Sequence, residues 1–199
     1  MQFTVPIELG TTQGIRDLPR SLAGKAFLAV GATAFVALCA HVSFPLYFTP
    51  VPITLQTLAV ILVGLTLGPT LGFSAMVLYL AEGALGLPVF SPNAGPGGII
   101  QLLGPTAGFL VSYPLAAAAA GFVVRAIRIG RSQFPAAVLA GIAASLFIFA
   151  MGAGWIAFLL HLGTGAAWRL AVAPFLLGEV FKITAAAGAY TTLRRWNRP

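Results

Sequence analysis

Between Ala26 and Val124 the chain carries one charged residue, Glu82, in a run of 99 residues. Charged residues make up 8% of the whole sequence and hydrophobic residues 59%, with a mean hydropathy of +0.97. A chain of this composition cannot keep so much apolar surface out of water unless a lipid bilayer covers it. The sequence therefore predicts an all-α integral membrane protein with several spans.

Glycine, proline and the scarce charges divide the apolar sequence into segments. We expect one membrane domain at 25–193, between a cytoplasmic N-terminal segment at 1–24 and a basic cytoplasmic tail at 194–199. Residues 45–52 carry three prolines and predict an ordered extended loop. Six transmembrane helices are expected, at residues 25–44, 53–67, 69–85, 105–125, 135–162 and 167–193.

The basic residues predict the orientation of this domain. With six spans, nine of the eleven lysines and arginines fall on one side of the membrane, Arg169 falls on the other, and Lys182 lies inside. The positive-inside rule then places both termini in the cytoplasm and the protein in the cytoplasmic membrane. Because the basic residues flank apolar segments instead of forming a soluble stripe, no nucleic-acid partner is expected. The nine are Arg16, Arg20, Lys25, Arg125, Arg128, Arg131, Arg194, Arg195 and Arg198.

Two charges lie together in the last apolar segment. Glu179 and Lys182 are three residues apart, so a helix presents them on one face, where they can neutralise each other. One interpretation is an ion pair that only makes each charge tolerable. The other is a binding site for a small polar ligand, because ionisable groups inside a membrane usually face an interior cavity. Glu82 has no cation near it in the sequence, which leaves a cavity position, an interface position and a protonated state open.

The two long outer connections, 45–56 and 86–104, carry no charge and are rich in proline, glycine, phenylalanine and amide side chains. This composition suits folded caps over a cavity, although a tight outer loop needs the same glycines and prolines. The sequence predicts no metal site and no cofactor: Cys39 is the only cysteine, and His41 and His161 are isolated. No ATP-binding P-loop is present, so energy from ATP must come from another chain.

Two other functions are considered. An intramembrane enzyme would need a dyad of Ser74 with His41 or His161, whereas a serine on a small-residue helix face is the simpler reading. A passive channel for a small polar solute would need a polar lining repeated among helices, and only the last helix supplies charge of both signs. A non-enzymatic binding and transport protein fits the pattern better than either.

Four segments resemble BioY-type proteins, the biotin-specific substrate-binding subunits of energy-coupling factor (ECF) transporters. These segments are PVPITLQT at 50–57, GLPVF at 86–90, LGPTAG at 103–108 and GEVFK at 178–182. The resemblance implies high-affinity binding and uptake of biotin in a pocket open to the outside. It also implies three partner chains: a transmembrane coupling protein and two cytoplasmic ATPases.

The resemblance and the residue types together predict the roles of individual residues. Lys182 is expected to receive the biotin carboxylate or another polar edge, and Glu179, which stands where the family usually has aspartate, to accept from a ligand amide or orient the lysine. Gln56, Phe90, Asn93 and Gln101 are expected to cover and hydrogen-bond the bicyclic head. Small residues in the first helix, Ala29, Thr33 and Ala37, are expected to dock the coupling protein.

Overall fold

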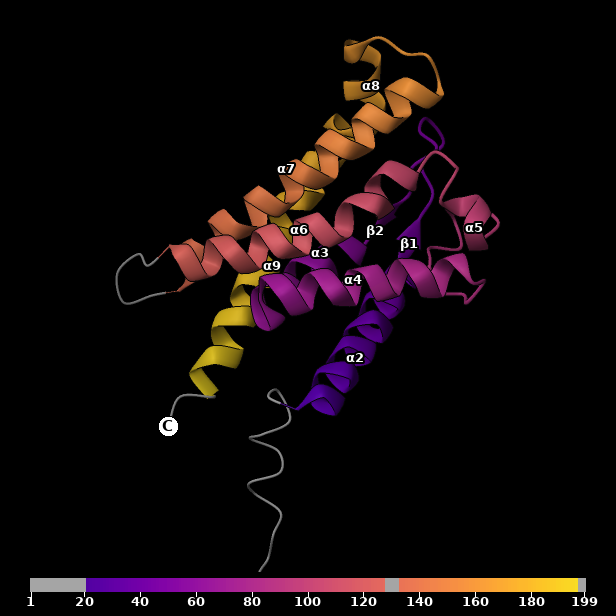
Figure 1. Cartoon of the computed structure of the whole chain (residues 1–199). Helices are drawn as coiled ribbons and strands as arrows, with labels where there is room; N and C mark the ends of the chain where they lie inside the picture. Colours follow the sequence, from indigo (N-terminus) through magenta and orange to yellow (C-terminus); the bar gives the residue numbers. More distant parts are fainter. Residues whose placement is uncertain (1–20, 128–132, 197–199) are drawn as a thin grey trace, which may run out of the picture.

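The computed structural model describes residues 21–127 and 133–196, and this part of the chain is mainly helical (Figure 1). Most of the predicted segment 1–24 and half of 194–199 lie outside these ranges, as do five of the basic residues used for the orientation. The elements are α2 (Leu22–His41), β1 (Ser43–Phe44), β2 (Ile53–Thr54), α3 (Gln56–Leu67), α4 (Pro69–Ala84), α5 (Gly98–Gln101), α6 (Ala107–Ala126), α7 (Phe134–Leu159), α8 (Thr164–Ala171), the 3₁₀ turn η1 (Ala173–Phe175) and α9 (Leu176–Trp196).

The first five predicted helices are present, with ends that local chemistry sets. The Ser21 side chain accepts from the Gly24 N–H at 2.9 Å and caps α2. Pro69 occupies the first turn of α4, where its missing N–H costs no hydrogen bond. The first helix ends three residues before its predicted end because Ser43 and Phe44 pair with Thr54 and Ile53 as a small antiparallel sheet.

The sixth predicted helix, 167–193, is wrong as a continuous element. The chain forms α8, breaks at Val172 with φ −127° and ψ −61°, turns through η1 and continues as α9. Pro174 explains the break, since its ring provides no N–H for a helical bond and clashes with the preceding turn. The break lets Phe175 and the start of α9 face the interior while α8 lies across the end of α7 (Figure 1).

The outer connections also differ from simple loops. Residues 45–52 link β1 to β2, and the Thr49 hydroxyl donates to the Leu170 carbonyl at 2.8 Å, which ties this connection to α8. The second connection contains the short helix α5. In Figure 1 α5, α8 and the β1–β2 pair lie toward the same end of the molecule.

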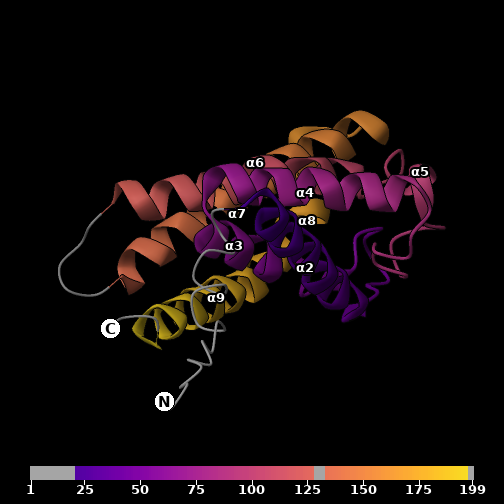
Figure 2. The same ribbon diagram turned by 60° about the horizontal axis from the view of Figure 1, so that its bottom comes forward.

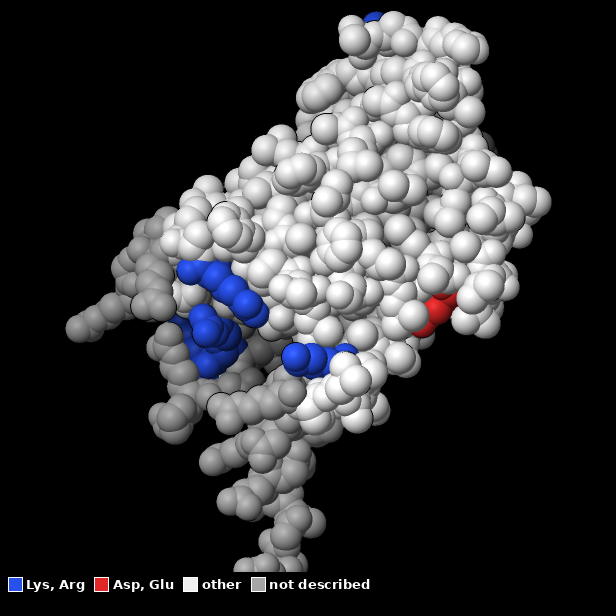
Figure 3. Space-filling view, in the orientation of Figure 1, with Lys and Arg blue, Asp and Glu red and all other residues white. Residues whose placement is uncertain are grey.

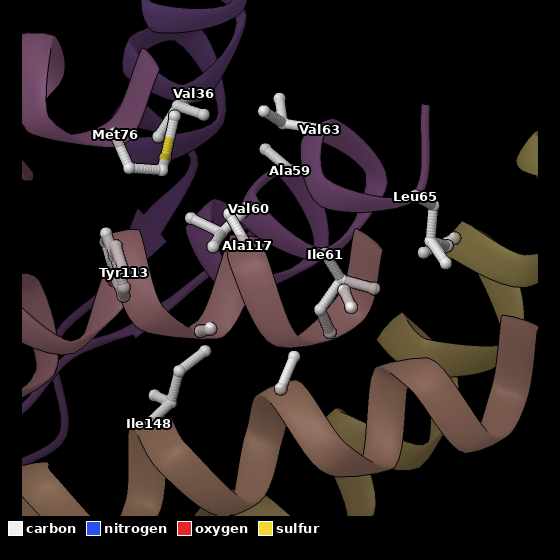
Figure 4. Close-up of a cluster of buried hydrophobic side chains, with 14 of the residues drawn as sticks. Val36, Ala59, Val60, Ile61, Val63, Leu65, Met76, Tyr113, Ala117 and Ile148 are labelled. Carbon is white, nitrogen blue, oxygen red and sulfur yellow. The ribbon is translucent and has the colours of Figure 1, made fainter. Parts of the chain in front are cut away.

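Helix α6 occupies the middle of the bundle and packs against α3, α4 and α7, whereas α9 packs against α3 and α7, and α2 against α4 and α3. Figure 2 shows α2 and α9 on the same side of the layer that contains α4 and α6. The interior between α3, α6 and α7 is filled by buried apolar side chains, including Ile61, Ala117 and Ile148 (Figure 4). The bundle thus has one continuous core.

Four stretches of the described chain are long and apolar enough to cross a membrane: Leu22–His41, Ala107–Ala126, Phe134–Leu159 and Thr164–Trp196. Helix α3 has 12 residues and α4 has 16, so at 1.5 Å per residue each is shorter than the ~30 Å hydrocarbon core. The chain is therefore a multi-pass membrane protein, and the two short helices lie packed against longer ones.

Charge is concentrated at the two ends of the bundle. Lys25 begins α2, Arg125 lies in the last turn of α6, and Arg194 and Arg195 lie in the last turn of α9. Figure 3 shows basic atoms gathered at this end of the visible face, a small basic patch at the opposite end, and one acidic patch on a surface otherwise almost free of charge. In the described chain Arg169 of α8 is the basic residue of the far end.

Close helix packing near the basic end depends on Gly121. A Cβ atom on Gly121 of α6 would lie 2.5 Å from the backbone of Gly68 and Pro69, whereas one on Gly31 of α2 would meet nothing within 4 Å. We expect Gly121→Ala to lower the free energy of unfolding by about 1 to 3 kcal/mol through overpacking. Gly31→Ala is the matched control, and it should be neutral or stabilising by up to about 1 kcal/mol. Thermal unfolding in detergent measures both, and equal midpoints for the two variants would contradict this packing.

Candidate functional site

A cavity lies at the end of the bundle opposite the basic helix ends, beneath the two outer connections. Its empty volume is about 540 Å³, and this figure includes the solvent space at its open mouth. The walls come from α3, α6, α7 and α9, and the roof from the segments around β2 and before α5. The lining residues are Val51, Pro52, Thr54, Gln56, Thr57, Ser91, Ala94, Gln101, Thr106, Phe109, Leu110, Tyr113, Ile148, Phe149, Phe175, Glu179 and Lys182.

Glu179 is the buried acid of this cavity, 4% exposed, and three helices supply its partners. Ser145 of α7 donates to Oε1 at 2.7 Å, and Thr57 of α3 donates to Oε2 at 3.1 Å. The ammonium of Lys182, one turn further along α9, lies 3.4 Å from Oε2. Since a buried carboxylate is destabilising unless it is paired and hydrogen-bonded, these contacts explain how α9 carries an acid inside the bundle.

Lys182 is 8% exposed and donates to the Thr57 hydroxyl at 3.0 Å as well as to Glu179. An ammonium has three N–H donors, so one remains for a ligand. The two oxygens of Glu179 accept three hydrogen bonds from protein groups, which leaves acceptor capacity on the cavity side. The pair is thus a neutral unit that offers one donor and one acceptor to the same small volume.

Two buried glutamines add acceptors from other sides. The amide N–H of Gln56 donates to the Tyr79 hydroxyl, which in turn donates to the Val89 carbonyl at 2.8 Å. The amide N–H of Gln101 donates to the Ser91 carbonyl at 3.2 Å. Among the described residues nothing donates to either glutamine's Oε1, so both carbonyl ends are available to the cavity.

Phe90 and Asn93, expected to touch the ligand, do not line the cavity. Phe90 is 4% exposed but packs edge-to-face on Tyr79, with ring centroids 5.4 Å apart, and fills the space beside Gly83, where a Cβ would lie 2.0 Å from its ring. Asn93 is exposed and donates to the carbonyl and hydroxyl oxygens of Ser43 at 3.1 and 2.7 Å. In this arrangement Phe90 packs beneath the connection and Asn93 ties it to Ser43 from the exposed side, so contact of either side chain with a ligand stays a prediction.

The predicted docking stripe on the first helix lies partly inside the bundle. Ala29 and Thr33 are buried within the bundle, Ala37 is half-buried, and the Thr33 hydroxyl donates to Glu82 Oε1 at 3.1 Å. The stripe is therefore partly occupied by contacts within the chain, and docking of a coupling protein at these residues stays a prediction. Glu82 is half-buried between α2 and α4 and lies outside the cavity lining.

Sequence reasoning missed several residues of the site. Thr57 follows Gln56 directly and bridges Glu179 and Lys182. It is the last residue of the segment 50–57 that carried the family resemblance, so this segment could have indicated it. Ser145 lies in a featureless apolar helix and gave no signal. The apolar wall, formed by Phe109, Leu110 and Tyr113 on α6 with Ile148 and Phe149 on α7, follows from helical periodicity only once the helices are oriented.

The serine–histidine dyad of the enzyme alternative is absent from the described residues. Ser74 is exposed and donates to the Thr70 carbonyl of its own helix at 3.0 Å. The His41 ring pairs with the Ala37 carbonyl at 2.8 Å, one turn back in α2. No group of histidine, cysteine and acidic side chains suited to a metal occurs in residues 21–127 and 133–196. Of the sites considered, the cavity is the one that brings charged and amide side chains together.

Comparison with known proteins gives concordant results. The BioY family model matches residues 11–198. A probable biotin transporter BioY of Pyrococcus horikoshii is 39% identical over 69% of this chain and 76% of its own length. One of Bacillus subtilis is 36% identical, covering 80% of this chain and 85% of its own. The biotin transporter BioY of Rhodobacter capsulatus is 37% identical, covering 76% and 83%.

A solved structure shares the fold. The crystal structure of the S-component for biotin from an ECF-type ABC transporter superposes with a TM-score of 0.78, and the match covers 93% of this chain and 94% of that one. The sequence identity is 24%. At this identity the likeness concerns the arrangement of the helices.

The contacts of Asn93 predict how the roof is held. Asn93→Ala removes both hydrogen bonds to Ser43 and should free the connection that carries Tyr47 and Phe48, which are exposed. Chymotrypsin should therefore cut after Tyr47 or Phe48 several-fold faster than in the wild-type protein. Ser74→Ala, which changes only a hydroxyl on the exposed face of α4, is the control. Equal cleavage rates in all three proteins would show that Asn93 does not hold the roof.

Proposed function

Because this chain belongs to the BioY family, we propose that it binds biotin with high affinity and takes it up across the cytoplasmic membrane as the substrate-specific subunit of an ECF-type transporter. The chain acts in transport and is not an enzyme. The observation that carries the proposal is the neutral Glu179–Lys182 pair at one wall of a cavity that is otherwise apolar except for buried amides and hydroxyls.

The chemistry of this wall suits the ureido group of biotin. A ureido group has two N–H donors and one carbonyl acceptor, and the Glu179 carboxylate can accept from an N–H while the third Lys182 proton donates to the carbonyl. The oxygens of Gln56 and Gln101 offer an acceptor for the other N–H. The aromatic and aliphatic residues of α6 and α7 then cover the thiophane ring and the alkyl chain, as in most small-molecule sites.

The charges at the ends of the bundle support a cytoplasmic location for both termini. With the basic helix ends in the cytoplasm, the cavity faces outward and meets the vitamin on its uptake side. Six spans result if α3 and α4 each cross with the help of neighbouring helices and α8 with α9 counts as one. The transmembrane coupling protein and the two cytoplasmic ATPases are proposed as partners, since the chain itself contains no ATP-binding P-loop.

Biotin binding is expected to depend on Lys182. Lys182→Ala removes the free donor and leaves Glu179 buried without its cation, so affinity should fall at least ten-fold, about 1.4 kcal/mol. Lys25→Ala, at the exposed start of α2, should bind as the wild-type protein does. Titration of the purified proteins in detergent measures both. Unchanged affinity in a folded Lys182→Ala protein would remove this pair from the site.

The two charges are expected to act as one unit. If they do, combining Lys182→Ala with Glu179→Gln should cost less affinity than the sum of the two single changes, by about 0.5 to 3 kcal/mol. The same titrations, arranged as a double-mutant cycle, give this coupling energy. Strict additivity would show that each residue meets the ligand independently.

Orientation can be tested in whole cells. In a Cys39→Ser background, Gly163→Cys at the start of α8 should react with an impermeant thiol reagent added outside, whereas Gln133→Cys at the start of α7 should react only after the cells are opened. Each variant serves as the control for the other. Outside labelling at position 133 would invert the proposed topology.

A further inference from the structure

One polar atom of the cavity has no protein partner. The Thr106 hydroxyl oxygen is the single buried side-chain polar atom without a hydrogen bond in the described part of the chain, and the residue is 6% exposed. Thr106 lines the cavity that also contains Glu179 and Lys182. Since a buried hydroxyl without a partner is destabilising by about 1 to 3 kcal/mol, this atom points to a ligand contact.

Thr106 occupies the N-cap position of α6, a helix of 20 residues. A threonine at this position usually accepts from an N–H of the first turn, but here, with φ −88° and ψ −3°, its side chain makes no capping bond. The first-turn N–H groups of a helix have no intrahelical partners, and the helix dipole concentrates partial positive charge there. The Ala107 N–H donates to the Gly104 carbonyl at 3.1 Å, so the N–H groups of Gly108 and Phe109 are the first-turn donors that remain beside the Thr106 hydroxyl.

The turn before α6 is held in place by α7. The Trp155 indole donates to the Gly104 carbonyl at 2.8 Å, two residues before Thr106. Phe109 and Leu110, in the first turn of α6, are cavity-lining residues as well. An anchored helix start with an apolar wall next to it is a preorganised place for the polar end of a ligand that has an alkyl chain.

The charges of the cavity require such a place. Its described lining contains one acid and one base, which neutralise each other 3.4 Å apart. A ligand that brings its own carboxylate therefore adds one uncompensated negative charge to a buried site. We propose that the N-terminus of α6, with Thr106 as hydroxyl donor, is the subsite that binds the carboxylate of the ligand. This inference rests on the proposed function and assigns the opposite end of biotin, its ureido group, to Glu179 and Lys182.

The test compares biotin with biotinamide, which has the same head and chain but a neutral end. Thr106→Val keeps the shape of the side chain and removes the hydroxyl. Biotin affinity should fall at least ten-fold in this variant and biotinamide affinity less than three-fold, so that the ratio of the two affinities falls. Thr106→Ser, which restores a hydroxyl, should keep the wild-type ratio. Thr66→Val is the control, because the Thr66 hydroxyl lies outside the cavity and bonds only to carbonyls of its own helix.

A second variant guards against a folding defect. Aspartate is a favoured N-cap residue, so Thr106→Asp should fold, and its carboxylate should repel biotin while leaving biotinamide bound. A wild-type ratio in both Thr106→Val and Thr106→Asp overturns the carboxylate subsite, as does an equal loss of both ligands. Wild-type protein that binds neither biotin nor biotinamide overturns the proposed function and this subsite with it.

Discussion

The buried pair of Glu179 and Lys182 is the interaction on which the rest of the structure depends. Two charges on one helix are tolerable in a bilayer only if they meet each other and if the remaining lone pairs and protons find partners. Ser145 of α7 and Thr57 of α3 supply these partners, so the pair fixes where α3, α7 and α9 converge. The cavity lies at this convergence, with Thr57, Glu179 and Lys182 in its wall.

Helix α6 runs from the tightly packed basic end of the bundle to the end that contains the cavity. Near its basic end, Gly121 lets the backbone of α6 approach the α3–α4 turn with no room for a side chain, and this contact seals the interior. Toward the other end Phe109, Leu110 and Tyr113 line the cavity. The same helix therefore makes the bundle tight on one side and leaves a shaped, largely apolar space on the other. Gly121 permits the tight packing, and the large side chains of Phe109, Leu110 and Tyr113 shape the cavity.

The sequence predicted what composition and spacing determine, and failed where tertiary packing decides. The helices, the membrane location and the pairing of Glu179 with Lys182 depend on local sequence, so they could be predicted from it. The positions of Phe90 and Asn93 were not, because a loop residue can face either side of the segment that carries it. The same limit applies to Thr33, where a small-residue stripe suits a partner helix and the chain's own α4 equally well. Ser145 could not be predicted either, because only the packing of α7 against α9 brings its hydroxyl to Glu179.

A short chain of polar contacts runs through the roof of the cavity. Gln101, whose carbonyl end is available to the cavity, donates to the Ser91 carbonyl, the Ser91 hydroxyl donates to Ser43, and Asn93 donates to Ser43 from outside. This chain joins the connection before α3 to the connection before α6. A ligand that hydrogen-bonds the Gln101 side-chain oxygen is therefore expected to stabilise these contacts, and by reciprocity the contacts favour binding of that ligand. Asn93 is linked to Gln101 through Ser43 and Ser91, although it does not line the cavity.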